Sequence, residues 1–243
     1  MNGNMEESIF YYKLLPNKSA YSISLNTTLD IPNNIEIPKE YNGLPVTHIE
    51  SKGFANCENL ISVFIPNTIK SINSYGAFKG CTRKLDSYAF YRCENLINII
   101  NKENKDNIQI LGESCFMYCD SIKKVYFEKV KKIEKNCFLD CRSLEEIHLD
   151  SVKFIGETAI YRSSTIKKIN LGKELKYIDR YGISPRENSQ IFINAIIPPV
   201  YEEGLFCYFD YNVPSESVEL YKKAPTWSVC SNRIYPLTKN LIE

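Results

Sequence analysis

Apolar positions recur with a fixed spacing along most of this chain. Each unit runs aliphatic, small residue, Phe, Cys, Leu, and then alternating aliphatic residues, as in the segment that begins at Ile49. The clearest successive units begin at Leu111, Ile133 and Ile155, and their starts are 22 residues apart. The second half of each unit alternates with period two, which predicts a short strand, and the first half predicts a helical or 3-10 turn.

One such unit cannot bury its own apolar face, so the units are expected to stack around a shared core. A period of 22 or 23 residues is typical of a leucine-rich-repeat solenoid. We expect an α/β repeat in which each unit contributes a short strand and a short helical or 3-10 turn. Two units deviate: the one from Ile72 through Cys81 is short, and the one at Leu85 carries a polar insertion, Asn101–Asn107, expected to be a surface loop.

Both ends depart from the repeat and are expected to be caps of one continuous domain. Residues 1–34 predict a hairpin-like cap, 35–193 the solenoid, and 194–243 a second cap. The second cap follows the breaker Pro198-Pro199. It contains a short predicted helix with Ser215 as its N-cap, and Trp227 is expected to cover the last coil.

Three stretches together resemble the BspA-like leucine-rich-repeat family. They are the first segment Ile37–Ile49, the repeated core Gly76–Cys81 with its equivalents, and the last segment Val213–Lys222 followed by Trp227. The resemblance covers roughly residues 20–237. It implies a right-handed α/β solenoid with short parallel strands on the concave face and short helical or 3-10 turns opposite. It also implies a role as a surface adhesin or secreted interaction protein, and it brings no catalytic residues. The fifth unit departs from the family pattern, with Ile160 and Ser163 in place of Phe and Cys.

Composition narrows the function. The chain has 243 residues, 44% of them hydrophobic, and a formal net charge of +1. A nearly neutral chain lacks the excess of positive charge that is typical of proteins that bind nucleic acid. No segment predicts membrane insertion. No signal peptide is visible, so the sequence alone predicts a cytoplasmic protein with reduced thiols. The family resemblance instead suggests the cell surface or secretion.

The nine cysteines allow several interpretations. Cys57, Cys81, Cys93, Cys119 and Cys141 share one repeat column, while Cys115 and Cys137 fill a slot that elsewhere holds Gly or Ala, and both sets are interpreted as small buried hydrophobes. A zinc site on Cys115, Cys119, Cys137 and Cys141 is the sharper alternative. A Cys119–Cys141 disulfide is a further hypothesis if the protein is exported. No metal or cofactor is expected.

Catalysis is not expected either. A hydrolase would need a thiolate beside a histidine. Of the two histidines, His48 and His148, the second is expected to point out of a strand, away from the inward cysteines.

The strongest candidate site is the outer face of the predicted sheet. One outward side chain per coil forms a row: Phe64, Ile100, Tyr126, His148, Asn170 and Phe192. A second row alternates in charge: Lys124, Glu146 and Lys168. Within the first row, Phe64, Ile100 and Tyr126 make an apolar run. Such a run beside charges favours recognition of a protein or glycan partner on a host or neighbouring cell. The alternatives are that the charges only hold the coils in register, and that the chain is a structural scaffold without its own ligand.

Overall fold

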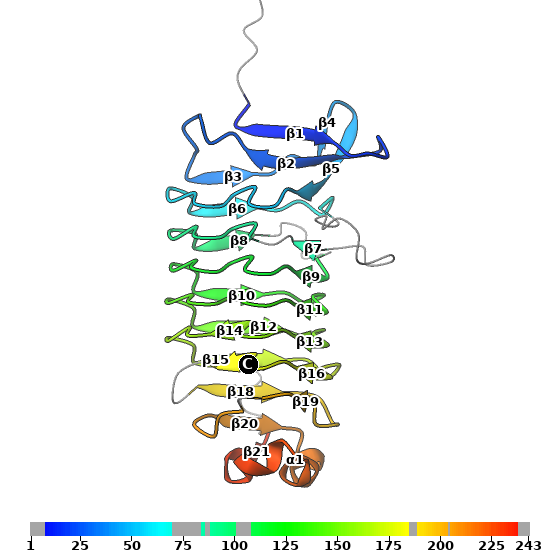
Figure 1. The fold of residues 1–243 in the computed structure, drawn as a ribbon, viewed down its shortest axis with the longest axis vertical. Helices are drawn as coiled ribbons and strands as arrows, with labels where there is room; N and C mark the ends of the chain where they lie inside the picture. Colours follow the sequence, from blue (N-terminus) through cyan, green and yellow to red (C-terminus); the bar gives the residue numbers. More distant parts are fainter. Residues whose placement is uncertain are drawn as a thin grey trace, which may run out of the picture.

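The computed structural model describes residues 8–69, 84–85, 88–100, 108–184, 189–203 and 205–237. The short unit at 72–81 and the insertion at 101–107 lie outside the described residues, as does the side chain of Ile100. The described coils stack one upon another in a nearly straight column with a cap at each end (Figure 1). The predicted repeat solenoid is thereby confirmed.

One long face of the column is a parallel sheet with one strand per coil. Its upper part has the order β3-β6-β8 and its lower part the order β10-β12-β15-β18-β20-β21. The strands of this face are β3 (Asn34–Glu36), β6 (Ser62–Phe64), β8 (Asn98–Ile100), β10 (Lys124–Tyr126), β12 (Glu146–Leu149), β15 (Lys168–Leu171), β18 (Gln190–Ile193), β20 (Asp210–Val213) and β21 (Ile234–Pro236). Within β12 and β15 burial alternates, because one side chain of each pair enters the core and the next faces outward.

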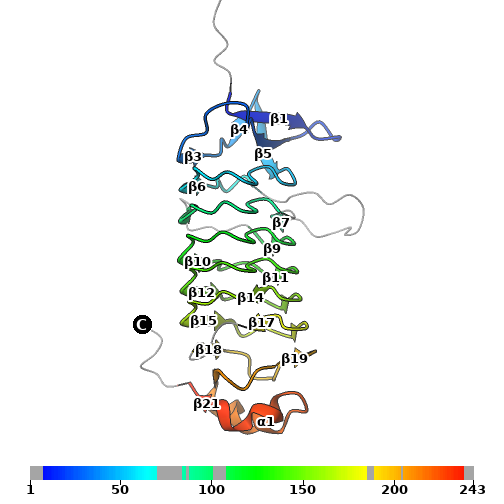
Figure 2. The same ribbon diagram turned by 60° about the vertical axis from the view of Figure 1, so that its left-hand side comes forward.

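A second parallel sheet runs down another side of the column (Figure 2). Its strands, in chain order, are β7 (Lys84–Leu85), β9 (Ile110–Leu111), β11 (Lys132–Ile133), β13 (Phe154–Ile155), β16 (Tyr177–Ile178) and β19 (Val200–Tyr201). The pair β14 (Ile160–Tyr161) and β17 (Ile183–Ser184) completes the described ladders. Each strand is only two residues long, so the chain bends between the two sheets within every coil.

The third side of each coil differs from the sequence-based prediction of a helical or 3-10 turn. Every second amide hydrogen-bonds to the next coil, as Phe116 does to the carbonyl of Cys137 at 2.9 Å, while intervening amides close tight turns. Residues with positive φ recur here twice in most coils, four positions apart, as Ser114 and Tyr118 do in one coil and Asn136 and Asp140 in the next. A helix would keep all these amides within its own coil. The observed turns instead share them with the neighbour, which links the stack.

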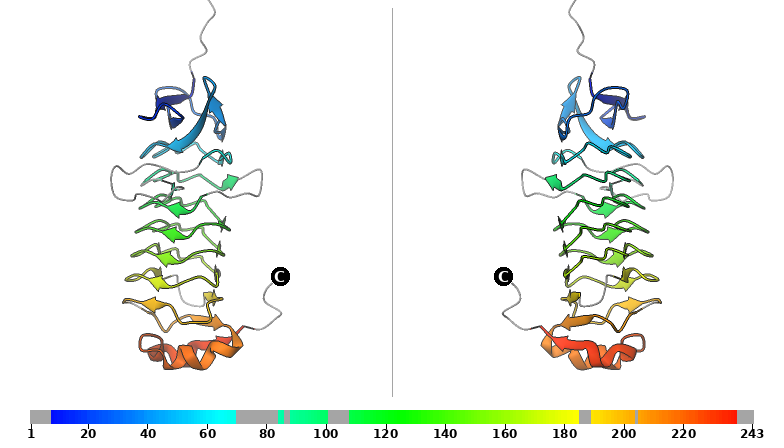
Figure 3. Two further views of the ribbon diagram at one scale, coloured as in Figure 1. Left: turned by 90° about the vertical axis from the view of Figure 1, so that its right-hand side faces the viewer. Right: turned by 90° about the vertical axis from the view of Figure 1, so that its left-hand side faces the viewer.

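The two ends have their own structure (Figure 3). β1 (Phe10–Leu14) and β2 (Tyr21–Leu25) form an antiparallel hairpin, and β2 continues in parallel onto β5 (Leu44–Ile49), which also pairs with β4 (Glu40–Tyr41). At the C-terminal end, η1 (Ser215–Ser217), α1 (Val218–Lys223) and η2 (Trp227–Arg233) cover the last coil.

The prediction of Ser215 as the helix N-cap is wrong. Pro214 precedes the 3-10 turn, which contains Ser215, and Ser217 precedes α1; neither residue makes a side-chain cap hydrogen bond.

Trp227 closes the core at this end. Its ring is 1% exposed and makes edge contacts with the rings of Tyr201, Tyr211 and Tyr221. Its indole N–H donates to the carbonyl of Pro199 at 2.7 Å, so the polar edge of the ring is satisfied.

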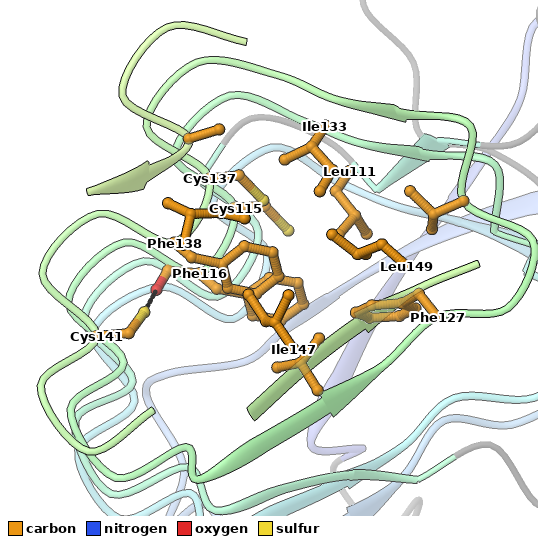
Figure 4. Close-up of a cluster of buried hydrophobic side chains, with 14 of the residues drawn as sticks. Leu111, Cys115, Phe116, Phe127, Ile133, Cys137, Phe138, Cys141, Ile147 and Leu149 are labelled. Carbon is orange, nitrogen blue, oxygen red and sulfur yellow. Dashed lines mark hydrogen bonds between the residues drawn. The ribbon is translucent and has the colours of Figure 1, made fainter. Parts of the chain in front are cut away.

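A stack of phenylalanine rings runs along the column axis. Phe54, Phe90, Phe116 and Phe138 are fully buried, and successive ring centroids lie 5.3 Å apart. Figure 4 shows Phe116 and Phe138 beside the aliphatic side chains of the two sheets. Because each coil contributes the same ring at the same place, burial comes from contacts between coils rather than within one coil.

A hydrogen bond to a backbone carbonyl explains why cysteine recurs at the same position of successive coils. The thiol of Cys141 donates to the carbonyl of Phe116 at 3.0 Å, as the dashed line in Figure 4 marks, and Cys119 donates in the same way to Phe90. Ser163 fills the column in the fifth unit, and its hydroxyl donates to Phe138 at 2.9 Å. The column therefore selects a small side chain that can donate one hydrogen bond.

The hypothesis of a Cys119–Cys141 disulfide is wrong. Both residues are free thiols, each engaged by a backbone carbonyl, and burial raises the pKa of both thiols well above the usual range. The structure does not support the zinc alternative either. In the described part of the chain no group of three or more His, Cys, Asp or Glu side chains is arranged to hold a metal ion. A buried protonated thiol is also a poor metal ligand.

The structure instead contains a disulfide that the sequence reasoning did not single out. Cys207 and Cys230 are bonded, with their Cα atoms 5.0 Å apart. The bond joins the loop before β20 to η2, so it fastens the C-terminal cap to the last coils. The prediction that all thiols are reduced is therefore wrong for this pair.

Candidate functional site

The outer face of the lower sheet contains a hollow of about 510 Å³. Its lining comes from successive coils: Lys124, Tyr126, Glu146, His148, Asp150, Lys168, Asn170, Phe192, Asn194 and Leu237. Parallel register brings these residues together. Tyr126 pairs with His148, His148 with Asn170, and Asn170 with Phe192, so one row crosses four strands.

The hollow follows from the sizes of the side chains along these rows. Tyr126 is large and 56% exposed, whereas His148 and Asn170 in the following coils are shorter. These shorter side chains leave the surface recessed beside Tyr126. Just beyond the row, a Cβ on Gly172 would lie 1.6 Å from the carbonyl oxygen of Asp150, so the close approach of these two coils requires glycine.

The charged row forms one side of the hollow in the predicted order. Lys124, Glu146 and Lys168 are laterally paired in consecutive strands. The Lys124 ammonium donates to a Glu146 carboxylate oxygen at 2.9 Å, and the Tyr126 hydroxyl donates to the other oxygen at 3.1 Å. The bond from Lys124, followed by that from Tyr126, holds the pKa of Glu146 below its usual value despite an opposing effect of burial. The carboxylate stays ionised and anchors both neighbours.

The middle row is held by hydrogen bonding and ring stacking. The amide of Asn170 lies 2.8 Å from Nδ1 of His148, and the imidazole stacks on the Tyr126 ring at a centroid distance of 4.6 Å. Burial lowers the pKa of His148, which outweighs the raising effect of Glu146. With neutral His148 accepting at Nδ1, Nε2 carries the proton. Nε2 lies 3.6 Å from the Glu146 carboxylate, too far for a good hydrogen bond.

The structure describes the predicted apolar run of Phe64, Ile100 and Tyr126 only in part. Phe64 is half-buried in the upper sheet and does not line the hollow. Ile100 pairs with Phe64 through the backbone, and its side chain lies outside the described residues. Phe192, expected to point outward, is only 3% exposed, and it lines the hollow with the Lys168 ammonium 5.4 Å from its ring centroid. The part of the row that lines the hollow is thus mixed polar and aromatic.

Seven of the nine predicted site residues therefore share one hollow, and three lining residues were missed. Asp150 and Asn194 lie two positions after His148 and Phe192, so the period-two pattern of outward positions could have found them. Leu237 gives no such signal. It reaches the hollow because the segment after β21 continues beside β20, where the amide of Leu237 bonds to Val213 at 2.7 Å.

Nothing in this geometry resembles an acid–base or nucleophilic centre. The Glu146 carboxylate is occupied by Lys124 and Tyr126, and His148 is bound to an amide rather than to a nucleophile. The described cysteines of the repeat point into the core with raised pKa values. The arrangement is a recessed surface with fixed hydrogen-bond donors and acceptors and one exposed ring. These features are typical of a binding site.

A parallel repeat solenoid with a recessed, polar face defines the class of protein: a repeat module for binding or scaffolding. The model of the BspA type leucine rich repeat region matches six copies, over residues 18–85 and 82–188. The chain belongs to this family, as the sequence resemblance indicated.

Solved structures agree on the fold. A leucine rich repeat protein of T. pallidum is 25% identical, with a TM-score of 0.52, over 76% of this chain and 84% of that one. A leucine rich cell surface protein of Faecalibacterium prausnitzii is 18% identical, with a TM-score of 0.63, over 88% of this chain and 52% of that one. This chain thus spans about half of the latter protein. No curated protein sequence matches.

These family members and neighbours are non-enzymatic repeat proteins. Among the described helices, none combines the length and the apolar character that crossing a membrane requires.

Proposed function

We propose that this protein is a non-catalytic recognition module of the adhesin or host-interaction type. It binds a protein or glycan on a host or neighbouring cell through the face formed by β10, β12, β15 and β18. The observation that carries this proposal is the hollow itself, where residues from consecutive coils converge on one exposed ring, Tyr126. Solenoids commonly bind on the face of their parallel sheet.

A scaffold without its own ligand is the competing function. A row of paired charges could serve only to keep the coils in register, since opposite charges on neighbouring strands attract by roughly 0.2–1 kcal/mol per pair. Register does not need a recess, however. The short side chains of the middle row keep the surface open where a scaffold would gain stability from larger packed side chains.

The proposal includes export to the cell surface or the medium. The Cys207–Cys230 disulfide supports it, because such bonds persist in oxidising compartments and are rare in the cytosol. The name of the Faecalibacterium prausnitzii neighbour, a cell surface protein, points the same way. Thiol counting on denatured, non-reduced protein from its native cell tests this part: seven free thiols fit export, whereas nine would mean that the pair is reduced in the cell.

The binding role is tested with fluorescently labelled protein on cultured epithelial cells and on neighbouring bacterial cells. We expect Tyr126→Ser to reduce cell binding strongly while the melting temperature stays nearly unchanged, because the ring is 56% exposed. Tyr11→Ser is the matched control, since Tyr11 is 54% exposed in the N-terminal hairpin. Phe64→Ser belongs in the series, although this half-buried ring makes it the less clean change. Equal binding by the Tyr126→Ser and Tyr11→Ser proteins would refute a role for this face.

A further inference from the structure

We propose that the hollow on the lower sheet binds a neutral saccharide, presented as a short segment of a cell-surface glycan. This inference rests on the proposed recognition function and names the chemistry of its ligand. It draws on three features of the hollow: its charge balance, its alternation of donors and acceptors, and its rigid exposed ring.

The charges that line the hollow cancel. Lys124 and Lys168 supply two positive charges, and Glu146 and Asp150 supply two negative ones. The cations and anions are also interleaved, because Glu146 lies between the two lysines in the register of the strands. A surface with no net charge gives no long-range preference for an acidic or a basic ligand. The ligand that fits is therefore polar but uncharged.

The hydrogen-bonding groups alternate between those that donate and those that accept. Ammonium groups only donate, ionised carboxylates only accept, and the amide of Asn194 does both. The Asn194 amide donates to the carbonyl of Leu171 at 2.9 Å, which holds its side chain in place. A hydroxyl group can both donate and accept, so a ligand with many hydroxyls can satisfy such a mixed set whichever group it meets. Saccharides are the common biological ligands with this property.

The Tyr126 ring is fixed before any ligand arrives. Stacking on His148 holds one face, and the bond from its hydroxyl to Glu146 holds its end. A ring that is already ordered loses little entropy on binding. The exposed part of the ring offers an apolar surface that suits the weakly positive C–H groups of a sugar ring. Phe192 in the floor adds a second apolar surface at the far end of the row.

The size and setting favour a short saccharide over a protein segment. A volume of about 510 Å³ lies within the roughly 300–1,000 Å³ typical of small-ligand sites. Strand spacing places Tyr126 and Phe192 about 14 Å apart across the row, so more than one sugar ring fits. A peptide that adds to a sheet needs an open strand edge, whereas β12 and β15 are paired on both sides.

Saturation-transfer NMR with the full chain tests the inference. The probes are neutral trisaccharides (maltotriose, cellotriose, mannotriose and chitotriose) with sialyllactose as the charged comparison. We expect transfer to at least one neutral probe. Tyr126→Ala should weaken that binding about tenfold, because it removes the stacking ring. Asn170→Trp should abolish it by filling the hollow, and Tyr11→Ala should leave it unchanged. Melting curves of all three variants show whether each one folds.

Failure of this inference is distinguishable from failure of the proposed function. The saccharide proposal is overturned if no neutral trisaccharide receives saturation transfer, or if the folded Tyr126→Ala protein retains the transfer in full. Cell binding provides the second readout. If Tyr126→Ser abolishes cell binding but periodate oxidation of the cell-surface glycans does not, the recognition function stands and its ligand is a protein. If neither treatment affects cell binding, both proposals fall.

Discussion

The phenylalanine stack gives a quantitative test of how neighbouring coils stabilise one another. Phe116 contacts three rings: Phe90 and Phe138 at 5.3 Å and Phe127 at 6.3 Å. Phe138 contacts only the Phe116 ring among the described residues, because Ile160 takes the equivalent place in the next coil. Both side chains are fully buried, so their hydrophobic transfer energies are alike. A comparison of Phe116→Leu with Phe138→Leu therefore isolates the ring pairs.

We expect Phe116→Leu to cost more stability than Phe138→Leu. Each ring pair contributes about 0.5–1.5 kcal/mol beyond the area it buries, so two additional pairs correspond to a difference of about 1–3 kcal/mol. Alanine at either position should cost about 3–5 kcal/mol, because it also leaves a cavity. The leucine pair is the sharper test, since most of the buried volume is retained.

Urea denaturation followed by circular dichroism and by Trp227 fluorescence measures both variants. The single tryptophan reports on the C-terminal cap, and circular dichroism reports on the whole solenoid. If the transitions followed by the two probes coincide, a two-state free energy of unfolding can be derived from them. An equal loss in the two variants, or a larger loss for Phe138→Leu, would refute the idea that ring contacts between coils add to burial.

The remaining predictions concern hydrogen bonds, the cap and pH. Cys141→Ser should cost about 1 kcal/mol less than Cys141→Ala in the same urea assay, because serine can still donate to the carbonyl beneath it, and equal losses would contradict this reading. Reducing the Cys207–Cys230 bond, which closes a 23-residue separation, should destabilise the cap by about 3 kcal/mol; unchanged Trp227 transitions with and without reductant would be evidence against it. Burial lowers the pKa of His148 in the folded state, so its contribution to stability is complete above the unfolded pKa of about 6.5 and declines as the pH falls through the lowered folded pKa. Melting temperatures between pH 4 and pH 8 should therefore fall less on acidification in His148→Gln than in the native chain.

Sequence periodicity predicts most of the column but only part of its local geometry. Inward positions such as Ile147 and Leu149 follow from alternation, and the structure buries both completely. In the first half of each unit, apolar residues spaced by four and five fit a helix, so the spacing predicts a helical turn there. The spacing cannot show that every second amide bonds to the next coil, since that depends on the left-handed residues at positions such as Ser114 and Asn136.

In the candidate site, too, the repeat predicts some features of the structure and leaves others unpredicted. The lateral order of Lys124, Glu146 and Lys168 follows from counting along the repeat, because parallel strands keep a constant register. Counting does not predict the burial of Phe192, nor the presence of Leu237, which lines the hollow from a segment outside the repeat. The sequence did not predict the Cys207–Cys230 bond for a similar reason. Both cysteines lie beyond the predicted repeat region, where the spacing of apolar residues does not indicate which residues are neighbours.

The regular length of the units from Leu111 onward also ties the height of the column to the number of units. One unit of 22 residues advances the stack by one strand spacing, about 4.8 Å, without altering what lies above or below. Duplication of a unit between the N-terminal hairpin and β10 would raise that hairpin by one step and leave the hollow intact. Copying whole units can in this way change the distance between the N-terminal hairpin and the proposed recognition face, with no change to the face itself.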